Sequence, residues 1–172
     1  MISGLDSDWY AAFVYTGEEE KVKNYITSRF NELRCFVPKR KLRERKQGKW
    51  HDVLRPLFPG YVLINGEIDI KDYYILKEIP GLCKVLCTGK DLLPIPKWEI
   101  RPICRLVNQG EVIGLSEIEE IGGQIRVIAG PLTGFEGSIV KIDRRKGRAK
   151  VRLDFLGEAR LVDLAVDIIR PL

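Results

Sequence analysis

Residues 126–143 read Arg-Val-Ile-Ala-Gly-Pro-Leu-Thr-Gly-Phe-Glu-Gly-Ser-Ile-Val-Lys-Ile-Asp, and this stretch decides the fold of the C-terminal part of the chain. Gly130-Pro131 marks a turn, because Pro fixes its own φ and disfavours a helical conformation in the residue before it. Gly134 and Gly137 can adopt positive φ or allow close backbone approach at little steric cost. The exit run 138–142 is rich in β-branched residues, which suit a pleated surface. The stretch therefore predicts a strand, a glycine-rich turn and a second strand.

The segment 148–155 that follows has an apolar residue at every second position. Successive side chains of a strand point to opposite faces, so we expect Ala149, Val151, Leu153 and Phe155 to point inwards. Arg148, Lys150 and Arg152 should point outwards, about 7 Å apart. Strands at this density favour a small five-stranded β-barrel of the SH3-like type over helices.

The spacing within 126–143 resembles the KOW motif, which occurs in the NusG family of transcription elongation factors and in some ribosomal proteins. The residues that carry the resemblance are Arg126-Val127, Gly130-Pro131, Gly134-Phe135, Gly137, Val140 and Asp143, and it continues through Val151, Phe155-Leu156-Gly157, Arg160, Val162-Asp163-Leu164 and Ile168. An ordinary β-hairpin in an unrelated barrel has the same local pattern, so the segment alone leaves both interpretations open.

The first hundred residues alternate between strand and helix patterns. A capping box of Thr16 and Glu19 is expected to start the first helix, and Asp69 to cap the second. The expected order is a strand at 8–15, a helix with an apolar stripe from Val22 to Leu33, strands at 34–38, 50–54 and 61–64, a helix from Asp69 to about Glu78, a strand at 82–88, and a helix near Pro96 that Pro102 distorts or starts. This order predicts an α+β domain in which helices pack on an antiparallel sheet.

Short motifs in this part resemble the N-terminal domain of the NusG family. They are Trp9-Tyr10, Phe36-Val37-Pro38, Phe58-Pro59-Gly60-Tyr61-Val62 and Ile79-Pro80-Gly81, and they occur in the family's order. With the KOW resemblance, nearly the whole chain is covered. We expect an N-terminal domain at 1–107, a linker at 108–120 and a KOW domain at 121–172.

Between the second and third expected strands lies the densest charge run of the chain. Gln47-Gly48 offers a turn there, so the run predicts a protruding basic β-hairpin. Its cations are Lys39, Arg40, Lys41, Arg43, Arg45, Lys46 and Lys49. Lys and Arg displace counterions from nucleic-acid phosphates, whereas a solvated hairpin whose charges deter edge pairing has the same composition. By position in the resembled family, this hairpin would face upstream or non-template DNA.

The charge of the chain is unevenly distributed. Residues 121–172 carry ten Lys and Arg against six Asp and Glu, residues 108–120 carry four Glu and no base, and the preceding residues carry nineteen bases against fourteen acids. Two basic modules joined by an acidic connector suggest polyanionic partners, although a solvated charged surface also fits these totals.

Several classes of protein do not fit the sequence. Acidic residues are scattered, His51 is the single histidine, and no P-loop or nucleophile elbow is present, so we expect a non-enzyme without cofactor or metal. The spacing of Cys35, Cys83, Cys87 and Cys104 fits no zinc template, which favours reduced thiols. Without a long apolar run or a signal-peptide pattern, we expect a cytoplasmic monomer with no membrane partner.

What the resemblance implies is a regulator that rides on RNA polymerase. In the NusG family the N-terminal domain docks an apolar surface on the clamp helices of the polymerase. The residues of this chain at the matching positions are Phe58, Pro59 and Tyr61, with Phe13 and Leu82. Aromatic anchors in a desolvated patch are typical of such contacts, and burial in the core is the alternative interpretation, above all for Leu82.

The KOW part departs from the housekeeping pattern, because Glu158 stands for Arg and Leu161 for Pro. This puts contacts with the termination factor Rho or the ribosome in doubt. The basic segment 143–147 and the outward row of Arg148, Lys150 and Arg152 suggest RNA binding instead. These two features make the chain resemble the specialised LoaP branch of the family, which promotes antitermination through an RNA element. The implied contacts with a nascent RNA hairpin are Lys141, Arg144, Arg145, Lys146, Arg148, Lys150, Arg152 and Arg160. A housekeeping NusG and a ribosomal or ribosome-assembly KOW protein remain the alternatives.

Overall fold

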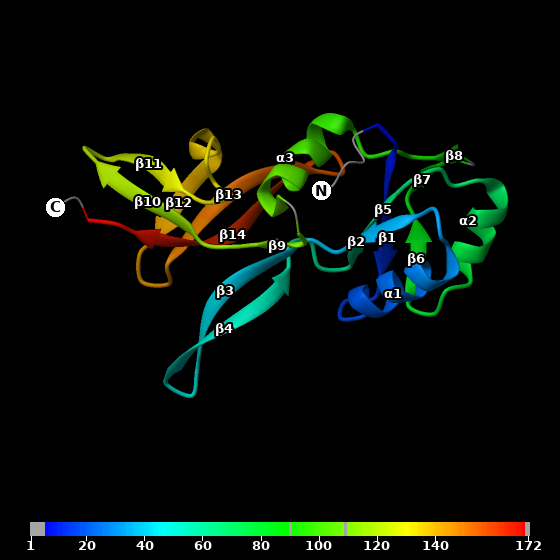
Figure 1. Ribbon diagram of the computed structural model, residues 1–172, viewed down its shortest axis with the longest axis horizontal. Helices are drawn as coiled ribbons and strands as arrows, with labels where there is room; N and C mark the ends of the chain where they lie inside the picture. Colours follow the sequence, from blue (N-terminus) through cyan, green and yellow to red (C-terminus); the bar gives the residue numbers. More distant parts are fainter. Residues whose placement is uncertain (1–5, 90, 109, 171–172) are drawn as a thin grey trace. The chain divides into compact units, whose positions relative to one another are not determined.

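The computed structural model describes residues 6–89, 91–108 and 110–170, and these residues form two units (Figure 1). The first unit contains the described residues up to Val37 and those from Phe58 to Arg101. The second contains Pro38–Leu57 and the described residues from Pro102 onwards. The basic hairpin therefore groups with the C-terminal part of the chain, although its residues lie within the N-terminal sequence.

The first unit is built on a four-stranded antiparallel sheet in the order β2-β5-β1-β6. Its strands are β1 (Trp9–Val14), β2 (Arg34–Phe36), β5 (Tyr61–Asn65) and β6 (Leu82–Val85). The helices α1 (Glu19–Arg29) and α2 (Ile70–Lys77) share one buried core with this sheet, in which Val22, Ile26 and Leu76 pack with Ala12 and Val62. The predicted antiparallel sheet with packed helices is confirmed.

The start of α1 differs from the prediction. Glu18 is the N-cap, and no side chain caps the helix. Glu19 turns inwards instead: its carboxylate accepts hydrogen bonds of 2.8 Å from the backbone N–H groups of Gly17 and Gly60, and only 3% of the residue is exposed. The predicted Thr16–Glu19 capping box is wrong, because this carboxylate satisfies two amides of the neighbouring turns.

The other predicted helices are present, with two adjustments. Asp69 caps α2 as expected, in a reciprocal capping box with Asp72. The predicted strand at 82–88 divides into β6 and β7 (Cys87–Thr88), and β7 pairs with β8 (Asp91–Leu92) in a separate sheet. The helix α3 (Lys97–Val107) contains Pro102 in its interior rather than at its start.

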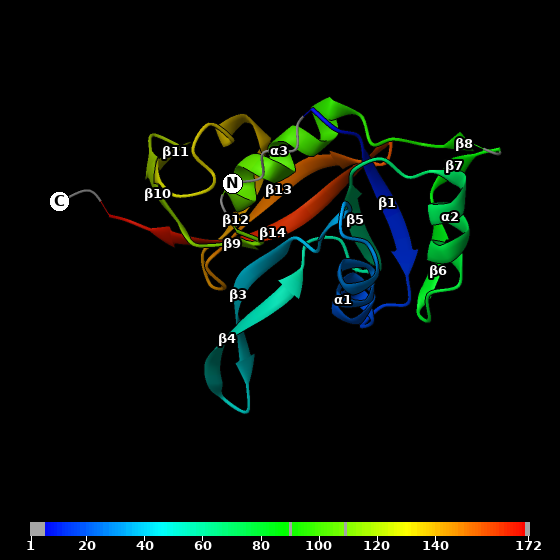
Figure 2. The same cartoon turned by 45° about the vertical axis from the view of Figure 1, so that its right-hand side comes forward.

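The basic hairpin forms as expected, within the second unit. It consists of β3 (Lys39–Lys46) and β4 (Lys49–Pro56), which pair in antiparallel register from Lys39–Pro56 to Lys46–Lys49 (Figures 1 and 2). Gln47 and Gly48 both have positive φ, of 51° and 78°. Positive φ at both loop residues is the conformation of two-residue type I′ turns, whose twist matches that of the flanking strands.

The second unit also contains a five-stranded sheet in the order β11-β10-β14-β13-β12. Its strands are β10 (Ser116–Ile121), β11 (Gln124–Ala129), β12 (Ile139–Asp143), β13 (Arg148–Phe155) and β14 (Glu158–Ile168), with a short 3₁₀-helix η1 (Glu136–Ser138) before β12. Ala149, Val151, Leu153 and Phe155 are all buried, as their alternation predicted. The strand–turn–strand prediction holds for β11 and β12, although the two strands lie at opposite edges of the sheet.

The segment predicted as a linker, 108–120, contains regular structure. The strand β9 (Val112–Ile113) pairs in parallel with β3, and β10 begins at Ser116. Ser116 and Ile118 are buried while Glu117 between them is exposed, which is the period-two alternation of a strand. The prediction of an irregular linker missed this pattern because the alternation covers so few residues.

The backbone conformation and close packing at position 130 require a glycine in the stretch 126–143. Its φ is +101°, and a Cβ atom there would lie 2.7 Å from the carbonyl oxygen of Leu115 and 2.7 Å from Cα of Ser116. The hydroxyl of Ser116 accepts a hydrogen bond of 3.0 Å from the N–H of Leu132. Only glycine permits this close approach of the turn to the start of β10.

We expect Gly130→Ala to lower the free energy of unfolding of the second unit by about 1–3 kcal/mol, through strain at positive φ and a backbone clash. Gly137→Ala is the matched control from the same stretch, since a Cβ there meets nothing within 4 Å, and its effect should stay below about 1 kcal/mol. Urea unfolding followed through the amide signals of Val151 and Phe155 measures both. Equal effects of the two substitutions would contradict the role given to Gly130.

Candidate nucleic-acid interface

The turn between β12 and β13 carries three consecutive exposed cations, Arg144, Arg145 and Lys146. Asp143 shapes this turn, because its Oδ1 accepts a hydrogen bond of 2.9 Å from the N–H of Lys146. That hydrogen bond lowers the pKa of Asp143 below its ordinary value. We call residues 143–147 the basic tip. Within the described part of the chain, Arg145 and Lys146 have no ion pair, so their charges are available to a ligand.

Most other cations predicted to bind RNA already have acidic neighbours within the second unit. Arg144 pairs with Glu120, and Lys150 lies 3.2 Å from Asp163. The remaining pairs are Arg152 with Asp154 at 3.9 Å and Arg160 with Glu158 at 3.7 Å, and the Arg160 guanidinium also lies over the Phe155 ring. Lys141 is exposed on β12. Exposed pairs of this kind are weak, and a phosphate can replace the carboxylate.

Arg148 occupies a different position, because it joins the five-stranded sheet to the basic hairpin. Its Nη2 donates a hydrogen bond of 2.9 Å to the carbonyl oxygen of Arg43, and its Nη1 lies 3.6 Å from the Asp163 carboxylate. Arg40 approaches from the hairpin and donates to the carbonyl oxygen of Asp163 at 2.8 Å. Burial lowers the pKa of Arg40. An RNA contact by Arg148 therefore requires these bonds to open.

The hairpin cations fall into two groups: four have bonds or ring contacts inside the second unit, and three lie exposed near the turn. Lys39 and Arg40 at its base bond within the unit, Lys39 to Glu111 at 3.0 Å. Lys41 lies 3.4 Å from Asp52, and the Arg43 guanidinium lies 5.8 Å from the centre of the Trp50 ring. The other predicted hairpin cations, Arg45, Lys46 and Lys49, are exposed near the turn.

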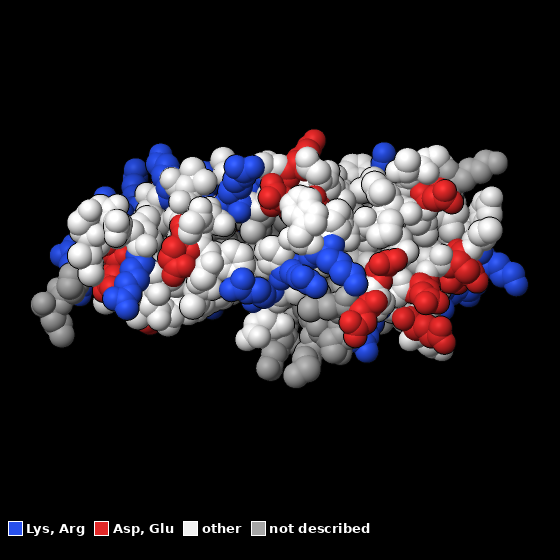
Figure 3. Space-filling model, turned by 90° about the horizontal axis from the view of Figure 1, so that it is seen from above, with Lys and Arg blue, Asp and Glu red and all other residues white. Residues whose placement is uncertain are grey.

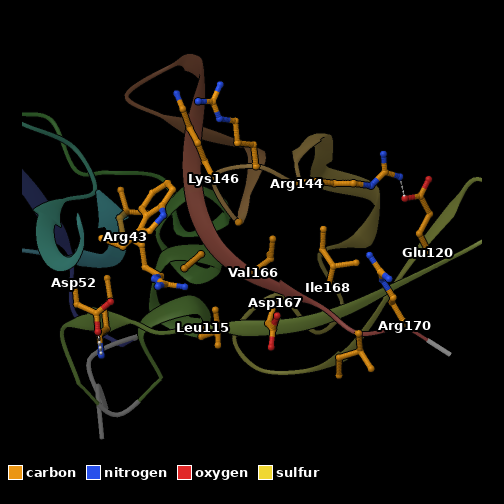
Figure 4. A pocket seen from close by; sticks show the side chains of 17 residues that line it. Arg43, Asp52, Leu115, Glu120, Arg144, Lys146, Val166, Asp167, Ile168 and Arg170 are labelled. Atoms are coloured by element: carbon orange, nitrogen blue, oxygen red, sulfur yellow. Dashed lines mark hydrogen bonds and ion pairs between the residues drawn. The ribbon is translucent and has the colours of Figure 1, made fainter. Parts of the chain in front are cut away.

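A pocket of about 940 Å³ lies between the hairpin and the basic tip, within the second unit. Figure 4 shows Val166, Asp167 and Ile168 of β14 across it, with Arg43 on one side and Arg144, paired with Glu120, on the other. Its cations are Lys41, Arg43, Arg144, Arg145, Lys146 and Arg170. We call this pocket the basic groove. Sequence analysis listed neither Trp50 nor Arg170 among the functional residues.

The predicted polymerase-binding residues lie in the first unit, and they separate by burial. Phe13 is 38% exposed, on the opposite face of β1 from the core residues Ala12 and Val14. Its ring lies 5.5 Å from that of Tyr61, and Pro59 next to Gly60 is exposed. Phe58 and Leu82, in contrast, are 3% and 7% exposed, so they support this patch from within the core.

The charged residues visible in Figure 3 do not form a single basic patch. On the face shown in Figure 3, Lys and Arg form several separate groups with Asp and Glu beside them. Among residues 6–89, 91–108 and 110–170, no three His, Cys, Asp or Glu side chains are placed to hold a metal ion. The four cysteines are free thiols, and burial raises the pKa of Cys104.

Comparison with known families matches two parts of the chain. The family model described as "Transcription termination factor nusG" matches residues 7–104, which is more than half of the chain, and the KOW motif matches residues 121–154. The chain belongs to the NusG family. The predicted fold class, an N-terminal sheet with helices followed by a strand-rich KOW region, is confirmed.

Relatives resemble the chain over nearly its whole length. The "Transcription termination/antitermination protein NusG" of Bacillus subtilis is 28% identical and that of Staphylococcus carnosus 27%; the matches cover 93% and 95% of this chain and 96% and 95% of the relatives. A solved structure described as "Domain interaction in Thermotoga maritima NusG" is 26% identical, with a TM-score of 0.61 and coverage of 95% of this chain and 96% of that one. Within the described residues, no helix is long and apolar enough to span a membrane.

Asp163 is the acid on which Arg148 and Lys150 depend, so we expect Asp163→Asn to destabilise the second unit by about 1–3 kcal/mol, because the half-buried guanidinium of Arg148 loses its counterion. Asp154→Asn changes the net charge equally but touches only the exposed pair with Arg152, and should cost less than about 0.5 kcal/mol. Urea unfolding at low salt compares the two. A difference that vanishes would show that the Asp163 pairs contribute nothing beyond net charge.

Proposed function

We propose that the chain is a cytoplasmic, non-enzymatic transcription elongation and antitermination factor that binds RNA polymerase through its N-terminal domain and a nascent RNA hairpin through its KOW domain. The N-terminal domain would span residues 1–107 and the KOW domain residues 121–172. Membership of the NusG family supports the transcriptional role. The observation that carries the RNA-binding part is the basic tip, where Arg145 and Lys146 are exposed beside Arg144 and have no ion pair among the described residues.

Polymerase binding is supported by the aromatic patch of the first unit. Phe13 and Tyr61 lie on adjacent strands with their rings in contact, and Pro59 adjoins them. The buried carboxylate of Glu19 holds the turn at Gly60 in place. Rigid aromatic side chains of this kind lose little conformational entropy on binding and are enriched among the residues that dominate protein interfaces.

RNA binding is supported by the electrostatics and shape of the basic tip. A hairpin stem presents phosphates and 2′-hydroxyls, while the deep major groove of A-form RNA is closed to side chains. A narrow turn with Arg144, Arg145 and Lys146 suits phosphate contacts. Lys150, Arg152 and Arg160 would add contacts by exchanging their weak carboxylate partners for phosphates. Lys141, which is exposed on β12, would add another.

A second function is favoured by a separate observation. Ile121, Ile128, Val140 and Leu161 of the five-stranded sheet are each more than 40% exposed. Exposed apolar side chains on a small sheet suit a protein partner, so a housekeeping role, in which the KOW domain binds Rho or the ribosome, is the alternative. The match of residues 7–104 to the NusG model argues against a ribosomal KOW protein.

Tyr61→Ala should weaken binding to RNA polymerase about tenfold or more, because an aromatic anchor is removed from the patch. Tyr74→Ala is the control, since Tyr74 is 61% exposed on α2, outside the patch. Biolayer interferometry with immobilised polymerase measures both. Equal affinities of the two variants would remove polymerase binding from this surface.

The double variant Arg145→Gln/Lys146→Gln should weaken binding of the full chain to a structured leader RNA and reduce the slope of log affinity against log salt by about 2, because two phosphate contacts are lost. Lys71→Gln/Lys97→Gln, at two exposed positions of the first unit, removes the same charge and should change the slope little. Fluorescence anisotropy between 50 and 200 mM salt measures both. If the chain captures Rho or the ribosome, and its affinity for RNA is unchanged in Arg145→Gln/Lys146→Gln, the housekeeping function replaces the RNA-binding one.

A further inference from the structure

The basic groove brings together cations that sequence analysis had assigned to two different ligands. Lys41 and Arg43 come from the hairpin expected to face DNA, whereas Arg144, Arg145 and Lys146 come from the tip expected to bind RNA. In the register of β3 and β4, Arg43 lies opposite Asp52 and Arg45 opposite Trp50. Residues directly opposite one another in an antiparallel pair share a face. One face of the hairpin therefore looks into the same groove as the tip.

The groove carries more positive charge than its own acids neutralise. Asp52 pairs with Lys41, and Glu120 pairs with Arg144. In the described part of the chain, the other groove cations have no carboxylate within ion-pair distance: Arg43, Arg145, Lys146 and Arg170. Asp167 is the one further acid that lines it. Like charges this close repel one another unless an anion lies among them, so the groove is complementary to a ligand with several negative charges.

The groove also has apolar surface that a ligand of charges alone would not use. Trp50 is 41% exposed at its hairpin side, and Leu115 and Ile169 are 53% and 38% exposed. The Arg43 guanidinium lies 5.8 Å from the centre of the Trp50 ring. An exposed indole with an arginine beside it is a suitable stacking site for an unpaired base. Bases stack on aromatic faces and on guanidinium planes, while their phosphates bind cations.

The shape of the groove favours single-stranded nucleotides over a duplex. Its volume of about 940 Å³ is that of a ligand pocket. The bases of a paired stem are buried in the stack, and only its outer phosphates are accessible. A stem would therefore make no contact with Trp50 or with the apolar groove residues Leu115 and Ile169. An unpaired strand next to a stem offers both phosphates and free base faces.

We propose that the basic groove binds unpaired RNA nucleotides that adjoin the RNA stem held by the basic tip, with a phosphate on Arg43 and one base stacked on Trp50. This inference rests on the proposed RNA-binding function and extends it to the hairpin β3–β4. The exposed cations near the hairpin turn, Arg45, Lys46 and Lys49, stay available for DNA.

The test compares two synthetic RNAs on the full-length chain. One is a stem-loop with a tail of six unpaired uridines, and the other is the same stem-loop without the tail. Fluorescence anisotropy should show tighter binding of the tailed RNA. Trp50→Ala should weaken binding of the tailed RNA about tenfold, and should leave binding of the tail-less RNA within about twofold.

Two further variants complete the design. Trp98→Ala is the matched control, because Trp98 is 61% exposed on α3 and does not line the groove, so it should change neither affinity. Arg43→Gln should reduce the preference for the tailed RNA as Trp50→Ala does. Because it keeps the indole, it also guards against a local rearrangement caused by removing a large side chain. Circular dichroism and thermal unfolding check that each variant is folded.

The outcomes separate this inference from the function on which it rests. Equal affinity for the two RNAs, unaffected by Trp50→Ala, overturns the groove proposal, while loss of stem-loop binding in Arg145→Gln/Lys146→Gln still supports RNA binding by the tip. If neither RNA depends on the tip, the proposed function itself fails. Displacement of the tailed RNA by a polyglutamate peptide or by duplex DNA at the same concentration as by single-stranded RNA would show a general polyanion site, and would also overturn the proposal.

Discussion

The second unit depends on the burial of two arginine side chains around Asp163. Arg40 from β3 and Arg148 from β13 both reach this residue, one at its carbonyl oxygen and the other at its carboxylate. Removing a guanidinium from water is costly unless it is bonded and paired. The Nε atoms of both arginines are buried and have no hydrogen-bond partner among the described residues of the protein. The contact joins the hairpin to β13 and β14, and residues of the hairpin and of β14 line the basic groove.

This contact changes which charges matter for binding. A count of basic residues treats all cations of the KOW region as equal, but Arg148 is 16% exposed at its side chain and is committed to the fold. Arg145 and Lys146 are available at once, and Lys150 or Arg152 only after releasing an acid. Binding strength therefore follows the number of cations that gain more from a phosphate than they lose from a carboxylate. In the proposed function, Glu120 and Asp163 of the second unit would compete with RNA for the same cations.

Local sequence patterns predicted most of the elements, but they did not predict the contacts between segments far apart in the sequence. The alternation in 148–155 predicted which residues of β13 are buried, because a strand with one buried face leaves only that choice. The helix cap at Asp69 was also predictable from the local sequence, since its partner Asp72 lies only three residues away. The prediction for Glu19 was wrong, because one of the N–H groups that donate to its carboxylate belongs to Gly60, forty-one residues away in the sequence. The roles of Trp50 and Asp163 were missed as well. They depend on the packing of the β3–β4 hairpin on β14, and neither segment alone has a pattern that predicts this contact.

The two candidate surfaces lie in different units, and this separation bears on how tightly each has to bind. In the aromatic patch, Phe13 is 38% exposed and Tyr61 is partly covered. Contacts made by this patch need not be tight by themselves if a second site already holds the factor at the polymerase. A factor already held by RNA that emerges from the polymerase would have an effective concentration in the millimolar range at its second site. In the proposed function, a weak patch would then suffice at transcripts that carry the RNA. In the proposed function, selectivity comes from the basic groove and tip, and the patch is under no pressure to be larger.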